Sequence, residues 1–245
     1  MSIFVKNIFI EREQIKKLVP LDVTQIANGE VRVFLWHHTF GRELLTTLAR
    51  ELSPTIDMDD IATLRDKRFI EKFSIRLLLK LLLPRATIEY LETGRPYLTS
   101  LGIEISISHT KHVYAISFSH DRHGIDVEQY SKTALKVKSM FVNNNELLWL
   151  QQREFPLGKI EKYTMLWSAK EAIYKYVDSP GLSFKKDIVT TYEGSTNLLL
   201  AKLPKQQSLC VVDVIPYPEF VLNVAKKDCN VPNIKPETNS LELPF

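Results

Sequence analysis

The stretch that decides the fold is EISISHTKHVYAISFSHDRHGIDVE, residues 104–128. It contains three short segments in which apolar and polar side chains alternate: 104–108, 113–119 and 124–128. Alternation with a period of two is typical of strands that bury one face. Ile105 and Ile107 are therefore predicted to face the core. The whole stretch predicts three consecutive strands.

Further strand patterns and helical patterns extend from this stretch in both directions. Strands are predicted over 30–37, 189–192, 198–203, 209–214 and 220–225. Helices are predicted over 61–83, 143–152 and 163–177. Acidic Asp59 and Asp60 precede the first helix, and Pro84 stops it. Each half of the chain thus combines strands with one long helix, and we expect an α+β fold with two subdomains, 1–120 and 121–245.

Composition places the chain among ordinary globular proteins. It has 245 residues, of which 44% are hydrophobic and 25% charged, and these values argue against global disorder. The net charge of +3 slightly favours anionic partners such as phosphates or acidic proteins. Cys210 and Cys229 are too few for a disulfide scaffold and indicate reduced thiols, which favours a cytoplasmic protein. No apolar run reaches the roughly 20 residues of a membrane helix, and the charged N-terminus does not resemble a signal peptide.

Two carboxylates stand two residues apart on the third predicted strand. Side chains at i and i+2 share a face, so Asp126 and Glu128 are expected to point outward together while Ile125 and Val127 face the core. Adjacent carboxylates repel one another, and a hard cation such as Mg²⁺ relieves that repulsion. The alternative is a solvated strand face.

The predicted helix over 163–177 carries a second charged group. Glu171 and Lys175 are one turn apart, which by itself is also typical of an exposed ion pair. A buried stripe is expected at Leu166, Ala169, Ile173 and Val177. That stripe leaves Lys170, Glu171 and Lys175 on or near the opposite face.

Basic side chains and hydrogen-bond donors lie upstream of these acids. On the predicted helix over 61–83, a basic residue recurs every fourth position, at Arg68, Lys72, Arg76 and Lys80. These side chains share one face, which is either a solvated surface or an anion site. Ser108 and His109 are expected in a Ser-His-Thr-Lys turn at a strand end, where they would form an anion cradle. The alternative for a lone histidine is a structural role.

The order and spacing of four motifs carry a family resemblance. They are Gly-Arg-Pro-Tyr-Leu at 94–98, Ile-Ser-Ile-Ser-His at 105–109, Gly-Ile-Asp-Val-Glu at 124–128 and Leu-Trp-Ser-Ala-Lys-Glu-Ala-Ile-Tyr-Lys at 166–175. Together they resemble the 4′-phosphopantetheinyl transferases, and within them the monomeric type that activates surfactin synthetase. The pattern Trp-Ser-x-Lys-Glu-x-x-x-Lys is the most specific of the four.

The resemblance implies a fold and an activity. The implied fold has two similar α/β subdomains, each an antiparallel sheet packed on a long helix, related by a pseudo-twofold axis. The implied reaction is the Mg²⁺-dependent transfer of the phosphopantetheine arm of coenzyme A to a serine of an apo acyl or peptidyl carrier protein, with release of adenosine 3′,5′-bisphosphate. A monomer with pseudo-dimeric architecture is expected, with no nucleic acid or membrane as partner.

The resemblance also assigns residues by their place in the motifs. Asp126, Glu128 and Glu171 correspond to the metal-binding acids, and Glu171 also corresponds to the general base. Lys175 corresponds to the lysine that stabilises the pyrophosphate or protonates the leaving group. The implied coenzyme A contacts are Arg65, Arg68, Arg76, Arg95, Ser108, His109, Lys170 and Lys175. Glu146 is placed near the water shell of the metal.

The chain departs from the family pattern at two places, and two alternative functions remain to be weighed. The spacing between Arg68 and Arg76 is one residue shorter than the family pattern, and Pro180 stiffens a loop that is glycine-rich in many members. The chain could instead be an inactive module that binds coenzyme A or a carrier protein, although the complete set of acids and lysines favours an enzyme. Nucleic-acid binding is disfavoured because the net charge is only +3 and no base-reading motif is present.

Overall fold

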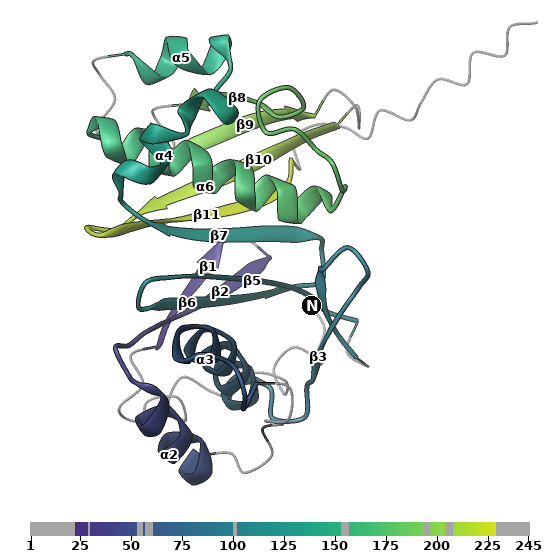
Figure 1. Cartoon of the computed structure of the whole chain (residues 1–245). Coiled ribbons are helices and arrows are strands. Elements are labelled where there is room, and N and C mark those ends of the chain that lie inside the picture. The colour runs from purple at the N-terminus through teal and green to yellow at the C-terminus, as the bar shows by residue number, and fades with distance from the viewer. Residues whose placement is uncertain are drawn as a thin grey trace, which may run out of the picture.

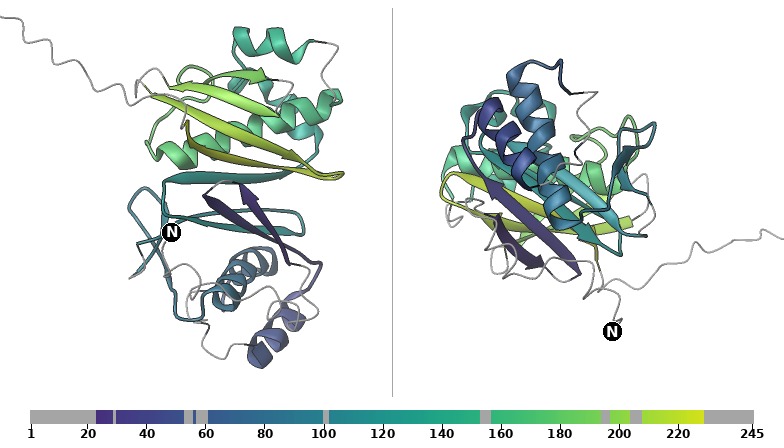
Figure 2. Two further views of the ribbon diagram at one scale, coloured as in Figure 1. Left: turned by 180° about the vertical axis from the view of Figure 1, so that it is seen from behind. Right: turned by 90° about the horizontal axis from the view of Figure 1, so that it is seen from below.

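The protein stacks four layers in the order helix, sheet, sheet, helix (Figure 1). This arrangement comes from a computed structural model that describes residues 23–28, 30–52, 56, 61–99, 102–152, 157–193, 197–203 and 208–228. The view from behind shows the same order of layers (Figure 2). None of the described helices is long and apolar enough to span a membrane.

The first sheet is antiparallel and has the strand order β1-β2-β6-β5. Its strands are β1 (Val23–Asn28), β2 (Val31–His37), β5 (Glu104–Thr110) and β6 (Val113–Ser119). Helices α2 (Arg42–Leu52) and α3 (Asp66–Leu82) cover one face, where Phe34 and Phe118 of the sheet pack with Phe69 and Phe73 of α3. A separate hairpin of β3 (Ile88–Tyr90) and β4 (Pro96–Leu98) follows α3.

The second sheet is antiparallel with the order β7-β11-β10-β9-β8, in which β8 to β11 form a meander and β7 pairs with β11. Its strands are β7 (His123–Gln129), β8 (Val189–Glu193), β9 (Leu198–Leu203), β10 (Ser208–Pro216) and β11 (Phe220–Lys227). Helix α6 (Lys159–Val177) packs on this sheet, α4 (Lys132–Lys136) packs on α6, and α5 (Asn144–Leu150) lies against β8. The 3₁₀ helix η2 (Lys138–Met140) lies between α4 and α5 in the chain. Met165, Leu166 and Ile173 of α6 are fully buried in this core.

The inner faces of the two sheets form a third core. Val33 of β2 and Ala115 of β6 pack there with Ile125 of β7 and Val224 of β11. The sheets divide between Ser119 and His123, next to the predicted joint. The mixture of helices and antiparallel sheets is therefore confirmed, whereas the division into subdomains and the pseudo-twofold axis stay predictions.

Gly124 sets how closely β7 approaches α6. A Cβ atom at this position would lie 2.2 Å from the carbonyl oxygen of Ala172 and 2.6 Å from the backbone nitrogen of Tyr176. Only a residue without a side chain allows strand and helix to pack at this distance. The close approach places the carboxylates of β7 beside the charged residues of α6.

The predicted strands around the central stretch are all present, but the helix predicted over 61–83 begins later. It starts at Asp66, after Arg65 in an extended conformation. Arg42 of α2 donates to the carbonyl oxygens of Ala62 and Leu64, so these two groups are bonded outside a helix. Asp59 and Asp60, which were expected at the helix start, lie outside the described residues. Strand β1 and helices α2 and α4 were not predicted.

Candidate active site

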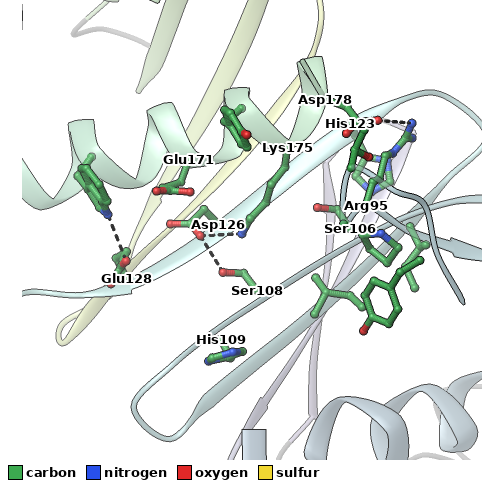
Figure 3. Close-up of a pocket in the computed structure, with 18 residues that line it drawn as sticks. Arg95, Ser106, Ser108, His109, His123, Asp126, Glu128, Glu171, Lys175 and Asp178 are labelled. Atoms are coloured by element: carbon green, nitrogen blue, oxygen red, sulfur yellow. Dashed lines mark hydrogen bonds and ion pairs between the residues drawn. The ribbon is translucent and has the colours of Figure 1, made fainter. Parts of the chain in front are cut away.

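A pocket of about 510 Å³ opens between α6, β7, β5 and the β3–β4 hairpin. Its walls combine residues from both halves of the chain, among them Arg95 and His109 from the first half and Asp126, Glu171 and Lys175 from the second (Figure 3). Four carboxylates, one lysine, one arginine and two histidines thus line one cavity. The motifs that lie far apart in the sequence meet here.

Asp126 is the centre of the polar network in this pocket. It is only 5% exposed, and its Oδ1 accepts hydrogen bonds from Ser108 Oγ (2.8 Å) and Lys175 Nζ (2.8 Å). Lys175 Nζ also donates to the carbonyl oxygen of Ile125 (3.0 Å). The second carboxylate oxygen, Oδ2, is buried and has no hydrogen-bond partner among the described residues. A buried carboxylate oxygen without a donor is costly and therefore points to a missing partner.

Glu128 and Glu171 lie on the same wall. Burial raises the pKa of Glu128 to about 7, and the charges of Asp126 and Glu171 act in the same direction. Trp167 Nε1 donates to Glu128 Oε1 (3.3 Å), which opposes that rise. Burial, followed by the charge of Asp126, also raises the pKa of Glu171, whereas Lys175 lowers it. Glu128 and Glu171 are therefore harder to ionise, first because they are buried and second because other negative charges are close.

The donor set suits a hard cation. Within the described parts of the chain, no three His, Cys, Asp or Glu side chains are gathered into a ready metal-binding group. Oδ2 of Asp126, which has no partner among the described residues, and the raised pKa values of Glu128 and Glu171 are nevertheless what a divalent cation would relieve. The outward position predicted for Asp126 was wrong, since this carboxylate is enclosed by α6 and β5.

A second pocket of about 530 Å³ meets the first at Tyr90, Ile107 and His109. Arg68, Lys72 and Arg76 of α3 line it, so the basic stripe faces a cavity along most of its length. Glu71 also lines it and accepts from Arg68 Nη1 (3.2 Å). Three cations against one acid make this pocket suited to an anionic group.

His109 and Arg95 each lie close to an acidic side chain at the pockets. His109 Nε2 lies 4.0 Å from Glu71 Oε2, and burial lowers the pKa of this histidine although Glu71 opposes the shift. Arg95 forms an ion pair with Glu104 and lies 3.8 Å from Asp178. Burial lowers the pKa of Arg95, with the charge of Arg122 as the next cause. Both side chains line the first pocket.

Lys170 does not lie where the sequence pattern placed it. Its side chain is fully buried, and Nζ donates to Glu146 (2.8 Å) and to the carbonyl oxygens of Phe141 (2.7 Å), Phe184 (2.7 Å) and Ile188 (3.0 Å). All of its donors are used inside the protein, so the expected exposed position and phosphate contact are contradicted. Lys175 forms its ion pair with Asp126, which disfavours the alternative of an exposed ion pair between Glu171 and Lys175.

Three further predictions are corrected. Ser108 and His109 lie on strand β5 rather than in a turn. Glu146 is completely buried, where it caps α5 and accepts from Thr190 Oγ1 (2.8 Å), and it does not line the pocket. Arg65 is exposed at the start of α3 and lines neither pocket.

Several lining residues were not predicted. Glu71 could have been found, because it lies three residues after Arg68 on the same helix face. Tyr90 lines both pockets and Asp178 lines the first, but neither position has a local signal in the sequence. Asp178 ends α6 in a left-handed conformation with φ 51°, which glycine adopts more readily.

Comparisons with known proteins agree with the two motifs that lie beyond residue 122. Residues 122–225 match the model of the 4′-phosphopantetheinyl transferase superfamily. The chain is also 29% identical over 86 residues to the 4′-phosphopantetheinyl transferase gsp of Aneurinibacillus migulanus. That match covers 35% of this chain and 35% of the relative's length. The resemblance to this superfamily is thereby confirmed over the part that contains the three carboxylates and Lys175.

Proposed function

We propose that the protein transfers the 4′-phosphopantetheine arm of coenzyme A to a serine of an apo acyl or peptidyl carrier protein. The observation that carries the proposal is the pocket in which Asp126, Glu128, Glu171 and Lys175 meet, within the segment that matches the transferase superfamily. The adjoining basic pocket supports it, because coenzyme A carries a pyrophosphate and a 3′-phosphate.

In this proposal Asp126, Glu128 and Glu171 hold Mg²⁺. Their oxygens are the ligand type that Mg²⁺ prefers, and their mutual repulsion would be relieved by the ion. Bound Mg²⁺ would supply positive charge against the pyrophosphate. The Asp126 oxygen Oδ2, for which the described part of the chain offers no hydrogen-bond partner, is the strongest support for this assignment.

Glu171 acts as the general base and Lys175 supports the leaving group. Glu171 accepts the proton of the attacking serine hydroxyl, and for this it must be ionised, which the charge of bound Mg²⁺ would favour. The serine oxygen forms a bond to the phosphorus of the arm, and the bridging P–O bond of the pyrophosphate breaks. Adenosine 3′,5′-bisphosphate leaves with the bond electrons, and the ammonium of Lys175 stabilises its negative charge.

The second pocket takes the 3′-phosphate of coenzyme A. Arg68, Lys72 and Arg76 line it and provide the charge-assisted hydrogen bonds that a phosphate needs. His109 lies at the junction of the two pockets and would contact the same ligand.

We further infer two subdomains, 1–120 and 121–245, related by a pseudo-twofold axis, in a monomer that works in the cytoplasm.

Intact-protein mass spectrometry tests the proposal. An apo acyl carrier protein incubated with the protein, coenzyme A and Mg²⁺ should gain the mass of one phosphopantetheine arm, and EDTA should abolish the gain. Glu171→Gln should lose the transfer, whereas Glu161→Gln on the same helix should keep it because Glu161 does not line the pocket.

The alternative is a module that binds coenzyme A or a carrier protein without catalysis. It predicts no mass gain with any carrier, together with calorimetric binding of coenzyme A. If Glu171→Gln transferred the arm at the parent rate, Glu171 would not be the general base. The protein would still be a transferase, and its activity would depend on the other acids.

A further inference from the structure

Strands β5 and β7 meet through side-chain hydroxyls, although they belong to different sheets. Three alternate residues of β5 accept hydrogen bonds from three alternate backbone N–H groups of β7. The bonds run from Ile125 N to Ser106 Oγ (3.0 Å), from Val127 N to Ser108 Oγ (3.1 Å) and from Gln129 N to Thr110 Oγ1 (3.2 Å). We call Ser106, Ser108 and Thr110 the hydroxyl ladder.

The ladder has a simple physical cause. β7 pairs with β11 along one edge, so alternate N–H groups on its other edge point away from that partner. The neighbourhood of Ile125 and Val127 is buried, and an N–H group left without an acceptor there would be costly. Hydroxyls reach these groups, while Ile105 and Ile107 of β5 pack toward α3 on the opposite face.

Ser108 differs from the other two members of the ladder. A hydroxyl can accept and donate at the same time, and the Ser108 hydroxyl does both. It accepts from Val127 N and donates to Asp126 Oδ1 at 2.8 Å. For Ser106 and Thr110, the described part of the chain shows no hydrogen bond to a carboxylate.

Two donors therefore converge on one oxygen of Asp126. Ser108 and Lys175 both bind Oδ1, which leaves Oδ2 buried and without a hydrogen-bond partner among the residues that the structure describes. In Figure 3 the Asp126 carboxylate lies between Ser108 on one side and Glu171 on the other. The orientation of the carboxylate is thus set jointly by Lys175 of α6 and by Ser108 of β5, a strand of the other sheet.

We propose that Ser108 is a positioning residue that holds Asp126 with Oδ2 presented to the divalent cation, and that it does not contact the phosphate of coenzyme A. This inference rests on the proposed function, because it assumes the cation. The hydroxyl is 94% buried and fully engaged within the protein, so it has no donor left for a ligand. Because Ser108 bonds both the backbone of β7 and the carboxylate of Asp126, a shift of one sheet against the other would also move this carboxylate.

Matched variants separate positioning from a purely structural role. Ser108→Ala removes one ladder bond and the donor to Asp126, whereas Thr110→Val removes a ladder bond alone, at a residue that lines neither pocket. Ser108→Thr keeps the hydroxyl. The affinity for MgCl₂ is measured by calorimetric titration without coenzyme A or carrier protein, and stability is measured by denaturant unfolding.

Both ladder deletions should lower the unfolding midpoint. Groups that orient metal ligands typically contribute 10–100-fold to metal affinity, so Ser108→Ala should weaken Mg²⁺ binding by about tenfold or more, while Thr110→Val and Ser108→Thr stay within about twofold of the parent. Equal Mg²⁺ affinity in Ser108→Ala and the parent would overturn the inference. An equal loss in Thr110→Val would also overturn it, by making the ladder merely structural.

The outcome can be told apart from a failure of the proposed function. A parent protein that binds Mg²⁺ but transfers no arm removes the transferase assignment and leaves the role of Ser108 intact. A parent protein that transfers the arm but shows no loss of Mg²⁺ affinity in Ser108→Ala removes the role of Ser108 alone. A parent protein that binds no Mg²⁺ removes the inference.

Discussion

Replacing Gly124 with alanine should push α6 away from β7. The added Cβ atom would lie 2.2 Å from the Ala172 oxygen and 2.6 Å from the Tyr176 nitrogen, and real Cβ atoms essentially never approach closer than 3.0 Å. Both contacts are backbone atoms of a helix, so no side chain can rotate to make room. The strand or the helix must move as a unit.

The expected loss follows from the kind of contact. Overpacking a well-packed core typically costs about 1–3 kcal/mol, and a double collision with helix backbone belongs at the upper end, about 3 kcal/mol. For a protein of this size, each kcal/mol lowers Tm by roughly 2–4 °C, so we expect Tm to fall by about 6–12 °C. Lys175 moves with the helix, so its 2.8 Å contact with Asp126 should lengthen and transfer activity should fall.

Thermal unfolding followed by circular dichroism measures this loss. Gly41→Ala is the control, because a Cβ atom at Gly41 meets no other atom within 4 Å. That control should change the free energy of unfolding by no more than about 0.5 kcal/mol. A Gly124→Ala protein whose Tm stayed within about 2 °C of the parent, less than the effect of 1 kcal/mol, would refute the packing argument.

Three further predictions concern charged residues. Lys170→Met leaves the fully buried carboxylate of Glu146 without its counter-charge. The free energy of unfolding, measured in urea, should therefore fall by about 3–5 kcal/mol. A fall of less than about 1 kcal/mol would contradict the buried ion pair. Burial lowers the pKa of His123 from 6.5 to about 4, so the folded protein binds fewer protons than the unfolded chain between these pH values. The free energy of unfolding should therefore fall as the pH drops from 6.5 to 4. His123→Gln should weaken this pH dependence, and an unchanged dependence would exclude His123 as its cause. Arg76→Ala should weaken the binding of coenzyme A, measured by calorimetry, by about tenfold, because a charge-assisted hydrogen bond contributes about 1.5–3 kcal/mol. Arg65→Ala should bind coenzyme A normally, because Arg65 lines neither pocket. Equal effects of the two substitutions would show that only the overall charge matters.

Local periodicity was enough to predict much of the fold. The alternation around Ile105 and Ile107 predicted β5, and the downstream alternating segments predicted the meander of the second sheet. These patterns depend on neighbours two residues apart, and they are visible without knowledge of the tertiary structure. The start of α3 was misplaced because Arg42, which lies more than twenty residues upstream, takes the carbonyl oxygens that would have extended the helix.

The main acids of the site could also be identified in advance. Asp126 and Glu128 share a strand face, and Glu171 and Lys175 share a helix face, so each pair follows from local geometry. The spacing of the motifs then indicated that the pairs act together. That Lys175 binds Asp126 rather than Glu171 could not be predicted, because it depends on how closely α6 packs on β7.

By itself, the sequence determined most of the strands, the two long helices apart from the start of α3, and the set of chemical groups available to the site. Only the tertiary structure decided which of these groups face the pocket. Lys170 and Glu171 are adjacent on one helix, yet Lys170 is buried against Glu146 and three carbonyl oxygens that are 14 to 29 residues away, while Glu171 lines the cavity. Ser108 likewise serves Asp126 because β5 and β7 lie side by side. Helical and strand periods describe neighbours along the chain, whereas burial and hydrogen-bond partners depend on which distant segments meet when the chain folds.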